Sequence, residues 1–562
     1  MFNRRDFFQT MAATAILMGG APQLVRAAAR QTISQDRLLD FEPLGQVTLL
    51  HLVDLHAQLM PIYFREPSIN IGVGEVAGLP PHLTGADFLA HFGIEASSPE
   101  AYALTSEDFV ALAQSYGRLG GLDRMATLVR AIRAERPGRT LLLDGGDSWQ
   151  GSYTALQTRG ADMVKATAAL GVEAMTAHWE FTYGTERVEE LIAEMNYPFL
   201  AGNVRDNEWQ EEVFQSTEVF ERGGLKIAVI GQAFPYTPIA NPRYKIPNWS
   251  FGIREQELQQ RVREARDGGA DLVVLLSHDG FDVDRKLASR VEGIDVILSG
   301  HTHDALPVVV EIGKTLMVAS GSHGKFLSRL DLDVQDGRIA DYRYRLIPVF
   351  SDAIEPDPEM AAVISEIRAP YEAELTRVLG HTESLLYRRG NFNGTFDDLI
   401  CQALLEERDA EIALSPGFRW GASLLPGQAI TVEDVFNQTA ITYPNAYRIE
   451  FTGAFLKEVL EDVADNLFNP DPYYQQGGDM ARVGGLSYTI DVGKPIGQRI
   501  TDMVHTKTGA PIEADKSYVV AGWASVNEGT EGPPVYDVLA KHIEAKKVVT
   551  VEENESIKIV GV

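Results

Sequence analysis

The stretch QVTLLHLVDLH, residues 46–56, joins an apolar run to an Asp-x-His pair that follows it directly. A short apolar run of this kind is typical of a buried strand in a layered α/β domain. Asp54 and His56 stand two positions apart, so in an extended chain their side chains point to the same side. The stretch therefore predicts a buried strand that delivers two metal-binding side chains at its end.

Four later fragments repeat this arrangement, each after an apolar β-like run, and together with the first they supply seven Asp and His side chains. Two divalent metals that share one bridging carboxylate need about this number of oxygen and imidazole ligands. The five fragments in this order therefore predict a two-metal hydrolase. The candidate ligands are Asp54, His56, Asp147, His178, His278, His301 and His303.

Strand-like and helix-like segments alternate up to about residue 320, which predicts an α/β layered domain. Residues 330–345 have the pattern of a closing strand pair. The predicted strands are 140–144, 225–231, 272–276 and 294–298, and the predicted helices are 119–136, 160–170 and 254–267.

The chain is too long for one hydrophobic core, and its composition changes suggest where the parts divide. We expect a catalytic domain over 40–347, a linker helix over 348–380 and a second α/β domain over 381–562. Residues 60–116 have no clear strand and are rich in glycine, proline and aromatic residues, so we expect an insertion. Because it lies between the first ligand pair and the predicted helix 119–136, it should be near the mouth of the active site.

The formal net charge of −29 argues against nucleic acid as a partner, since phosphate binding needs a basic surface. Residues 1–30 contain the twin arginine Arg4-Arg5, a short apolar stretch and an Ala-rich end. This segment resembles a Tat-type export signal and is too short to span a membrane. No other stretch has the pattern of a membrane span. Because of the Tat-like segment, we expect an exported, periplasmic protein.

The order of the five fragments resembles the calcineurin-like metallophosphoesterases, and within them the 5′-nucleotidase family. Gly120-Gly121-Leu122-Asp123-Arg124 matches a motif that follows that family's first ligand pair. The resemblance implies a four-layer αββα domain with a 5′-nucleotidase C-terminal-type domain behind it. It also implies that one metal takes Asp54, His56, Asp147 and His303, and the other takes Asp147, His178, His278 and His301.

One motif departs from the nucleotidase pattern. Where that family has Gly-Asn-His-Glu-Phe-Asp, this chain has Ala177-His178-Trp179-Glu180-Phe181-Thr182. The asparagine ligand becomes His178, the catalytic histidine becomes Trp179, and the aspartate that supports it becomes Thr182. An alkoxide leaving group benefits from a cationic donor, whereas a thiol with a pKa near 8.5 can leave as an anion with little help. The loss of both residues therefore favours hydrolysis at a sulfur-linked group.

Residues 178–184 and 54–59, with the Tat-like start, resemble the SoxB-type thiosulfohydrolases of the bacterial sulfur-oxidation pathway. That resemblance implies two manganese ions and metal-activated hydroxide attack on a cysteine S-thiosulfonate. It also implies that the cysteine belongs to the SoxYZ carrier protein, which keeps a persulfide when sulfate is released.

The substrate contacts are expected mainly from the second domain. Arg419, in the loop that takes the place of the nucleotidase anion loop, is our candidate to grip the sulfonate, because a guanidinium fork matches tetrahedral oxyanions. Trp179 is the second catalytic candidate, and Tyr443 and Asn391 are further substrate-binding candidates. Two alternatives remain open. One is a periplasmic 5′-nucleotidase or related phosphoesterase, and the other is a degenerate metallophosphoesterase that acts as a structural or carrier-binding protein.

Overall fold

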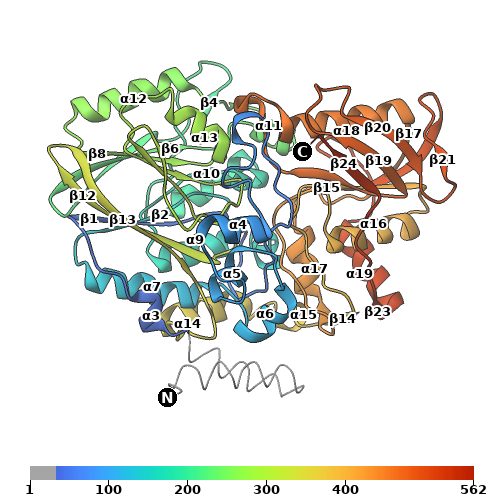
Figure 1. The fold of residues 1–562 in the computed structure, drawn as a ribbon, viewed down its shortest axis with the longest axis horizontal. Helices are drawn as coiled ribbons and strands as arrows, with labels where there is room; N and C mark the ends of the chain where they lie inside the picture. Colours follow the sequence, from blue (N-terminus) through green and yellow to red (C-terminus); the bar gives the residue numbers. More distant parts are fainter. Residues whose placement is uncertain (1–32, 562) are drawn as a thin grey trace.

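The computed structural model describes residues 33–561, so the predicted export signal lies outside the described residues. Figure 1 shows two halves side by side, a larger one that contains the first strands and a smaller one that contains the last. The larger half is built on two sheets. The first has the order β13-β12-β1-β2-β3, and the second has the order β10-β11-β9-β8-β6-β5.

The strands of the first sheet are β1 (Val47–Leu52), β2 (Thr140–Asp144), β3 (Ala174–Met175), β12 (Phe326–Gln335) and β13 (Arg338–Pro348). Those of the second are β5 (Thr217–Arg222), β6 (Leu225–Gln232), β8 (Leu272–Ser277), β9 (Val296–Ser299), β10 (Val310–Ile312) and β11 (Thr315–Ala319). β1, β2 and β3 run parallel, as do β6, β8 and β9. The strands predicted at 140–144, 225–231, 272–276 and 294–298 are therefore present, and β12 and β13 are the predicted closing pair.

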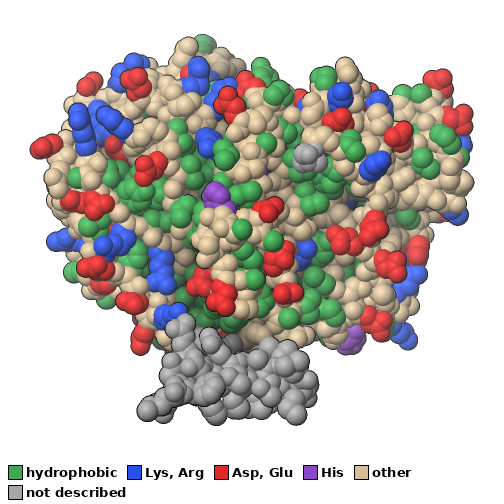
Figure 2. Space-filling view, in the orientation of Figure 1, with side chains coloured by type: hydrophobic (Ala, Val, Ile, Leu, Met, Phe, Trp, Pro, Cys, Tyr) green, Lys and Arg blue, Asp and Glu red, His purple; other side chains and the backbone are tan. Residues whose placement is uncertain are grey.

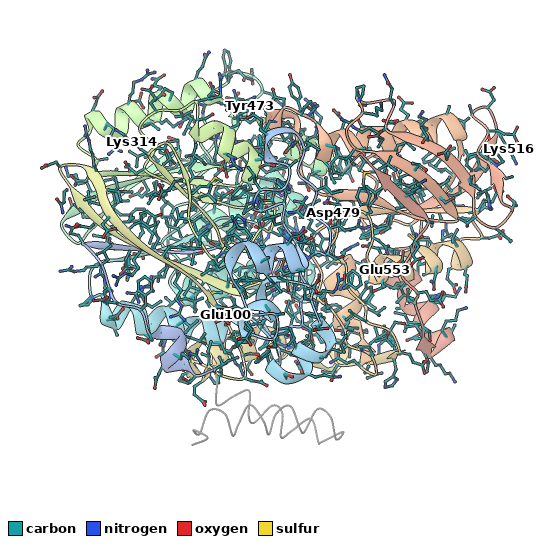
Figure 3. The ribbon with its side chains drawn as sticks, viewed as in Figure 1. Glu100, Lys314, Tyr473, Asp479, Lys516 and Glu553 are labelled. Atoms are coloured by element: carbon teal, nitrogen blue, oxygen red, sulfur yellow. The ribbon has the colours of Figure 1, made fainter. Side chains whose placement is uncertain are left out.

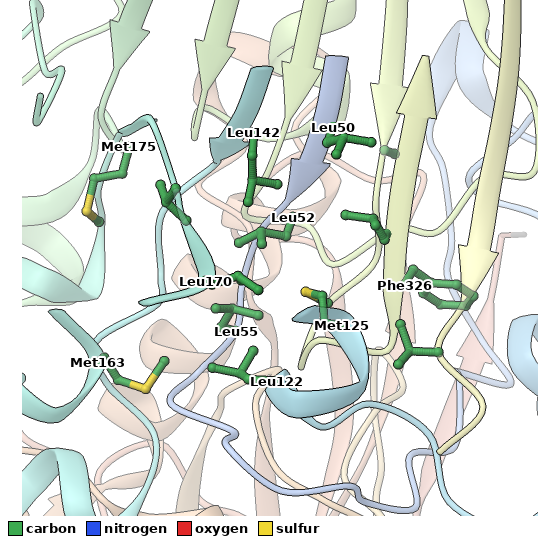
Figure 4. Close-up of a cluster of buried hydrophobic side chains, with 14 of the residues drawn as sticks. Leu50, Leu52, Leu55, Leu122, Met125, Leu142, Met163, Leu170, Met175 and Phe326 are labelled. Atoms are coloured by element: carbon green, nitrogen blue, oxygen red, sulfur yellow. The ribbon is translucent and has the colours of Figure 1, made fainter. Parts of the chain in front are cut away.

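Alternate residues of β1 separate two apolar layers. Val47 and Leu49 belong to the cluster that the two sheets share, whereas Leu50 and Leu52 belong to the cluster beneath the helices. Figure 4 shows Leu50 and Leu52 beside Leu142, with Leu122 and Met125 close by. A strand buried on both faces reads as a continuous apolar run rather than an alternating one.

Helices cover both outer faces of this sandwich. α7 (Leu122–Glu135), α9 (Ala161–Leu170) and α14 (Pro358–Arg368) pack together under the first sheet. α12 (Glu255–Asp267) contacts β6 and β8, and α13 (Phe281–Ala288) contacts β9. The predicted four-layer αββα architecture is confirmed, and the helices expected at 119–136, 160–170 and 254–267 correspond to α7, α9 and α12.

The segment between β1 and α7 folds into three short helices that the sequence analysis did not predict. They are α4 (Gly85–Phe92), α5 (Pro99–Leu104) and α6 (Phe109–Tyr116), and Figure 1 shows them in blue at the front of the molecule. Phe88, Tyr102 and Phe109 are buried in the same core cluster as the helices α7 and α9. The segment is therefore a packed part of the larger half.

The smaller half is also mixed α/β. One sheet has the order β17-β22-β15-β18 and a second has the order β21-β20-β19-β24. Its strands are β15 (Ile412–Gly417), β17 (Tyr447–Thr452), β18 (Asp479–Gly484), β19 (Leu486–Asp491), β20 (Ile500–His505), β21 (Ala510–Pro511), β22 (Ser517–Gly522) and β24 (Ile557–Val560). A small third sheet joins β14 (Val378–Thr382), β16 (Ala429–Thr431) and β23 (Val548–Val549). The helices are α16 (Thr395–Glu407), α17 (Val432–Thr439), α18 (Gly453–Phe468) and α19 (Val535–Lys546).

The connection between the halves contains two helices, α14 and the short α15 (Glu372–Leu375), before β14 begins. On the face shown in Figure 2, acidic and basic side chains are interspersed. Across the described residues, no helix has both the length and the apolar character that a membrane crossing requires.

Candidate metal centre

All seven predicted ligands meet at one edge of the sandwich. Each lies one to four residues beyond the carboxyl end of a strand. The strands concerned are β1, β2 and β3, which are neighbours in the first sheet, and β8 and β9, which are neighbours in the second. The carboxyl ends of parallel strands are where open α/β sheets place their binding sites.

The seven side chains form two clusters that share Asp147. One contains Asp147, His178, His278 and His301, and the other contains Asp54, His56, Asp147 and His303. Within each cluster the potential ligand atoms lie within 4.8 Å of one another, and all seven residues are buried. These are the two sets that the resemblance implied, with the same residue at their junction.

The candidate ligand atoms of the two clusters lie close to one another, and several of them have no hydrogen-bond partner. His56 Nε2 and His303 Nε2 lie 3.0 Å apart, and His278 Nε2 lies 3.3 Å from Asp147 Oδ2 and 3.5 Å from Asp54 Oδ1. Asp54 Oδ1, His178 Nε2 and His278 Nε2 are buried and have no hydrogen-bond partner. An unsatisfied buried polar atom costs about 1–3 kcal/mol. The cluster therefore fits bound cations, which would give these atoms partners.

The electrostatics of His301, His303 and the shared Asp147 agree with this interpretation. Burial holds the pKa values of His301 and His303 well below the ordinary range, so both imidazoles are neutral, which is the form that binds metals. Burial works to raise the pKa of Asp147, but His178 and His278 outweigh it and hold that pKa well below its usual value. Asp147 is therefore an ionised carboxylate at the point where the two clusters join.

Backbone contacts fix the ligand turns. The buried Glu180 carboxylate accepts hydrogen bonds from the backbone N–H of His178 at 2.8 Å and of Ser148 at 2.7 Å. Asp147 Oδ1 accepts one from the N–H of Trp179 at 2.7 Å. The turn after β2 and the turn after β3 are thus tied to each other, which sets the position of Asp147 against His178.

A cavity of about 210 Å³ opens over the two clusters. Its larger-half walls include Trp179, Phe234 and Tyr236, and its smaller-half walls include the loop 416–420 and the segment 476–479. The Trp179 ring lies 4.9 Å from that of His178 and packs edge-on against Phe418 at 5.4 Å. The cavity is therefore lined by both halves of the chain.

The four predicted substrate residues are placed differently. Arg419 and Trp179 line the cavity. Asn391 is buried beside it, where its amide donates to Asp479 Oδ1 at 3.2 Å and its oxygen accepts from the Ile71 N–H at 2.6 Å. Tyr443 is buried and donates its hydroxyl to the Ala240 carbonyl at 2.6 Å. Neither Asn391 nor Tyr443 is among the residues that line the cavity, and their role as substrate contacts stays a prediction.

Three residues of this region were missed by the sequence analysis. His323 is buried, its ring lies 5.3 Å from that of His56, and its Nε2 accepts from the Gly421 N–H at 3.1 Å. Arg389 is buried and donates to the Thr302 carbonyl at 3.2 Å. Asp479 lines the cavity beside Arg419. The run Gly477-Gly478-Asp479 was the available signal for the last of these, since paired glycines permit close backbone approach.

Comparisons with known proteins agree with this geometry. Residues 378–541 match the family model described as the 5′-nucleotidase C-terminal domain. The bovine 5′-nucleotidase is 25% identical over 461 residues, which is 74% of this chain and 79% of that protein. The human 5′-nucleotidase is 26% identical over 487 residues, which is 78% of this chain and 83% of that protein.

Solved structures extend the likeness over nearly the whole chain. A 5′-nucleotidase precursor from Thermus thermophilus has the same fold, with a TM-score of 0.72 at 21% identity over 92% of this chain and all of that one. The sulfate thiohydrolase SoxB of Thermus thermophilus superposes with a TM-score of 0.90 at 38% identity, over 93% of this chain and 98% of that one.

The layered fold, the C-terminal domain and the paired Asp and His clusters define a metal-dependent hydrolase of the 5′-nucleotidase superfamily. Identity of 38% over almost the full length of a SoxB protein carries the assignment one step further. The chain belongs to the SoxB family.

Proposed function

We propose that this protein hydrolyses the S–S bond of a cysteine S-thiosulfonate carried by a SoxYZ-type carrier protein. One water is consumed: its oxygen joins the sulfonate sulfur, the bond to the neighbouring sulfur breaks, and sulfate is released. The departing sulfur takes a proton and remains on the carrier as a persulfide. No oxidant or reductant is needed.

One observation carries this proposal. Four histidines line the cavity among the described residues, and all four, His56, His178, His301 and His303, belong to the two metal clusters. The position at which the nucleotidase motif supplies a free imidazole holds the indole of Trp179. Thr182, at the position of the supporting aspartate, shares a hydrogen bond of 2.7 Å between its hydroxyl and that of Thr442. The cavity thus offers no spare imidazole to protonate an alkoxide.

A sulfur leaving group suits such a cavity. A thiol has a pKa near 8.5, and a persulfide is more acidic, so either departs as an anion without a strong proton donor. The seven Asp and His residues would hold two ions, which we propose to be manganese, and those ions would supply an activated water and positive charge for the sulfonate oxygens. Arg419 would hold the sulfonate with its guanidinium fork.

The size of the cavity also supports a small end group as the substrate. Pockets that enclose a drug-sized ligand usually measure about 300–1,000 Å³, whereas this one measures about 210 Å³. Ile239, which is 53% exposed, and Val463 give its rim an apolar character. We propose that the flexible arm of the carrier passes this rim and presents its modified cysteine to the metal centre. The twin arginine at residues 4–5 supports export to the periplasm, where the carrier would be met.

The test offers the metal-loaded protein a thiosulfonated carrier peptide and AMP in parallel, with sulfate and phosphate measured separately. We expect sulfate release from the peptide and no phosphate release above the metal-only background. Phosphate release from AMP without sulfate release would instead establish a nucleotidase in which Trp179 is a tolerated change. Release of neither, by protein shown to hold two metals, would favour a carrier-binding role.

A further inference from the structure

Asp479 lies where the smaller half faces the metal centre, between the two halves in Figure 3. It begins β18 and is 3% exposed. Its carboxylate accepts from three side chains: Oδ1 from Arg419 Nε at 3.4 Å and Asn391 Nδ2 at 3.2 Å, and Oδ2 from Arg482 Nη2 at 3.3 Å. A buried carboxylate with three donors has one fixed orientation, so it fixes the position of the arginine that lines the cavity.

Asp479 is held in turn by a chain of buried charges. Arg482 Nε donates to Asp397 Oδ2 at 3.3 Å, and Arg388 Nη2 donates to Asp397 Oδ1 at 2.8 Å. Arg388, Asp397 and Arg482 are each at most 1% exposed. The signs alternate from Arg388 to Arg419, so three arginines and two aspartates leave one positive charge. Arg419, at the cavity end of the chain, is the arginine of the three that lines the cavity.

The segment that carries Asp479 also touches a metal ligand. The Gln476 carbonyl accepts from His301 Nε2 at 3.0 Å, three residues before Asp479. Arg419 is tied to the larger half as well, because its Nη1 donates to the Thr302 carbonyl at 3.3 Å, next to His301 in the chain. The distance between the guanidinium and the metal cluster is therefore fixed from both sides.

We propose that Asp479 is a positioning residue that holds Arg419 in register with the metal pair, so that a tetrahedral oxyanion meets both at once. This inference rests on the anion-holding role of Arg419 proposed above. Its physical basis is preorganisation: the side-chain entropy of Arg419 is lost on folding rather than on binding, and the planar fork is already aimed.

The test measures sulfate binding by calorimetry to the metal-loaded full chain, so its readout does not depend on turnover. We expect Asp479→Asn to weaken sulfate binding by about tenfold, the range of a hydrogen bond to a charged group, with two metals per chain retained. Asp479→Glu keeps the charge and is expected to recover part of the affinity. In the Arg419→Ala background, Asp479→Asn should add little, because the carboxylate acts through that arginine.

The matched control is Asp162→Asn, which alters another buried aspartate, 3% exposed, in α9. Sulfate binding should be unchanged in it. The proposal is overturned if Asp479→Asn binds sulfate normally, if its effect persists in full without Arg419, or if the metals are lost along with the affinity. An Arg419→Ala variant that binds sulfate as the parent does removes the role of Arg419 instead. Absence of sulfate release by the parent in the parallel assay would reject the thiosulfohydrolase proposal independently.

Discussion

Backbone strain is concentrated at the candidate ligands. Five of the seven have a positive φ, in the left-handed region that side chains other than glycine rarely adopt, at a cost of about 1–2 kcal/mol each. They are Asp54 at 52°, His56 at 45°, Asp147 at 58°, His301 at 75° and His303 at 60°. Such conformations persist only where the surrounding structure enforces them. The turns after the strands are therefore shaped to aim these side chains at the two clusters, as binding of cations there would require.

The shared position of Asp147 leads to a graded prediction about metal content. His178 belongs to one cluster and Asp147 to both. We expect His178→Ala to reduce bound metal from about two ions per chain to about one, and Asp147→Asn to remove most of both, because a bridging carboxylate serves two ions. Elemental analysis of the purified protein measures this. The exposed His381 provides the control, since His381→Ala should keep both ions. Equal losses in the first two variants would contradict the division into two clusters.

Trp179 and Thr182 allow the proposed chemistry to be tested by gain rather than loss. The double variant Trp179→His and Thr182→Asp restores the imidazole and its support that the nucleotidase motif contains. A positioned general acid contributes about 10²–10⁴-fold, so we expect AMP hydrolysis to rise at least about a hundredfold above the background of the parent. Trp179→Phe removes the indole without adding a donor and should show no gain. No rise in the double variant, with metal content intact, would mean that other residues exclude phosphate esters.

At the scale of elements, the segment 476–479 approaches the metal centre so closely at Gly477 that only glycine fits at that position. A Cβ added at Gly477 would lie 2.3 Å from His301 Nε2, whereas one at Gly478 would meet its nearest atom at 3.6 Å. Both glycines have a similar positive φ, 73° and 77°, so the two alanine variants carry similar backbone strain. The pair therefore separates contact with the metal ligand from strain.

We expect Gly477→Ala to weaken binding of one of the two metals by about 10–100-fold, the usual effect of disturbing a contact behind a metal ligand. Gly478→Ala should bind metal as the parent does. Titration of the metal-free proteins with manganese measures both affinities. If the two variants lose affinity equally, backbone strain and not the approach to His301 is the cause.

The insertion is tied to the larger half by a buried ion pair. Lys325, which is fully buried, donates to the Glu66 carboxylate, and its ammonium also lies 5.1 Å from the Phe64 ring. Removing one partner of a buried pair leaves an uncompensated charge and costs about 3–5 kcal/mol. We expect Glu66→Gln to lower the free energy of unfolding by about 3 kcal/mol, as measured by urea denaturation.

An exposed pair of the same residue types is the control. Lys165 contacts Glu366 at 2.7 Å, with side chains 44% and 71% exposed. Exposed pairs contribute about 0–1 kcal/mol, so Glu366→Gln should change stability by less than about 1 kcal/mol. An equally small effect of Glu66→Gln would show that the insertion is not held to the larger half by this contact.

Over the whole molecule, the features that could be predicted from the sequence are those set by local patterns. The run before Asp54 predicted β1, and parallel strands that end at one edge bring distant side chains together, so the seven residues that form the two clusters could be predicted without coordinates. The helices of the insertion were missed because they are only six to eight residues long and lie among glycines and prolines. Ser98 before Pro99 was a usable helix-start signal, since its side chain caps α5.

Arg389 and His323 could not have been assigned in this way. Each depends on a contact between segments far apart in the chain, such as Gly421 with His323, which are 98 residues apart. No spacing rule relates such positions, because the relative placement of the halves is a property of tertiary packing. Asn391 illustrates the reverse case: the sequence suggested a substrate contact, which stays a prediction, and its hydrogen bonds to Asp479 and Ile71 became visible only in the folded chain.

Because both halves contact the metal ligands, metal binding should stabilise segments of the smaller half as well as the strand ends. The loop 416–421 reaches His323 and the segment 476–479 reaches His301. A metal ion that binds only the folded state stabilises the segments that must be ordered to hold it. We therefore expect chelation to increase hydrogen exchange at 416–421 and 476–479 as well as in the turns that follow β1 and β2.

The sheet β21-β20-β19-β24 does not line the cavity over the metal centre, so it serves as the internal control and should exchange as before. Restoring manganese should restore protection. An increase confined to the larger half would mean that the smaller half closes over the site without depending on the metals, and the coupling argued here would be wrong.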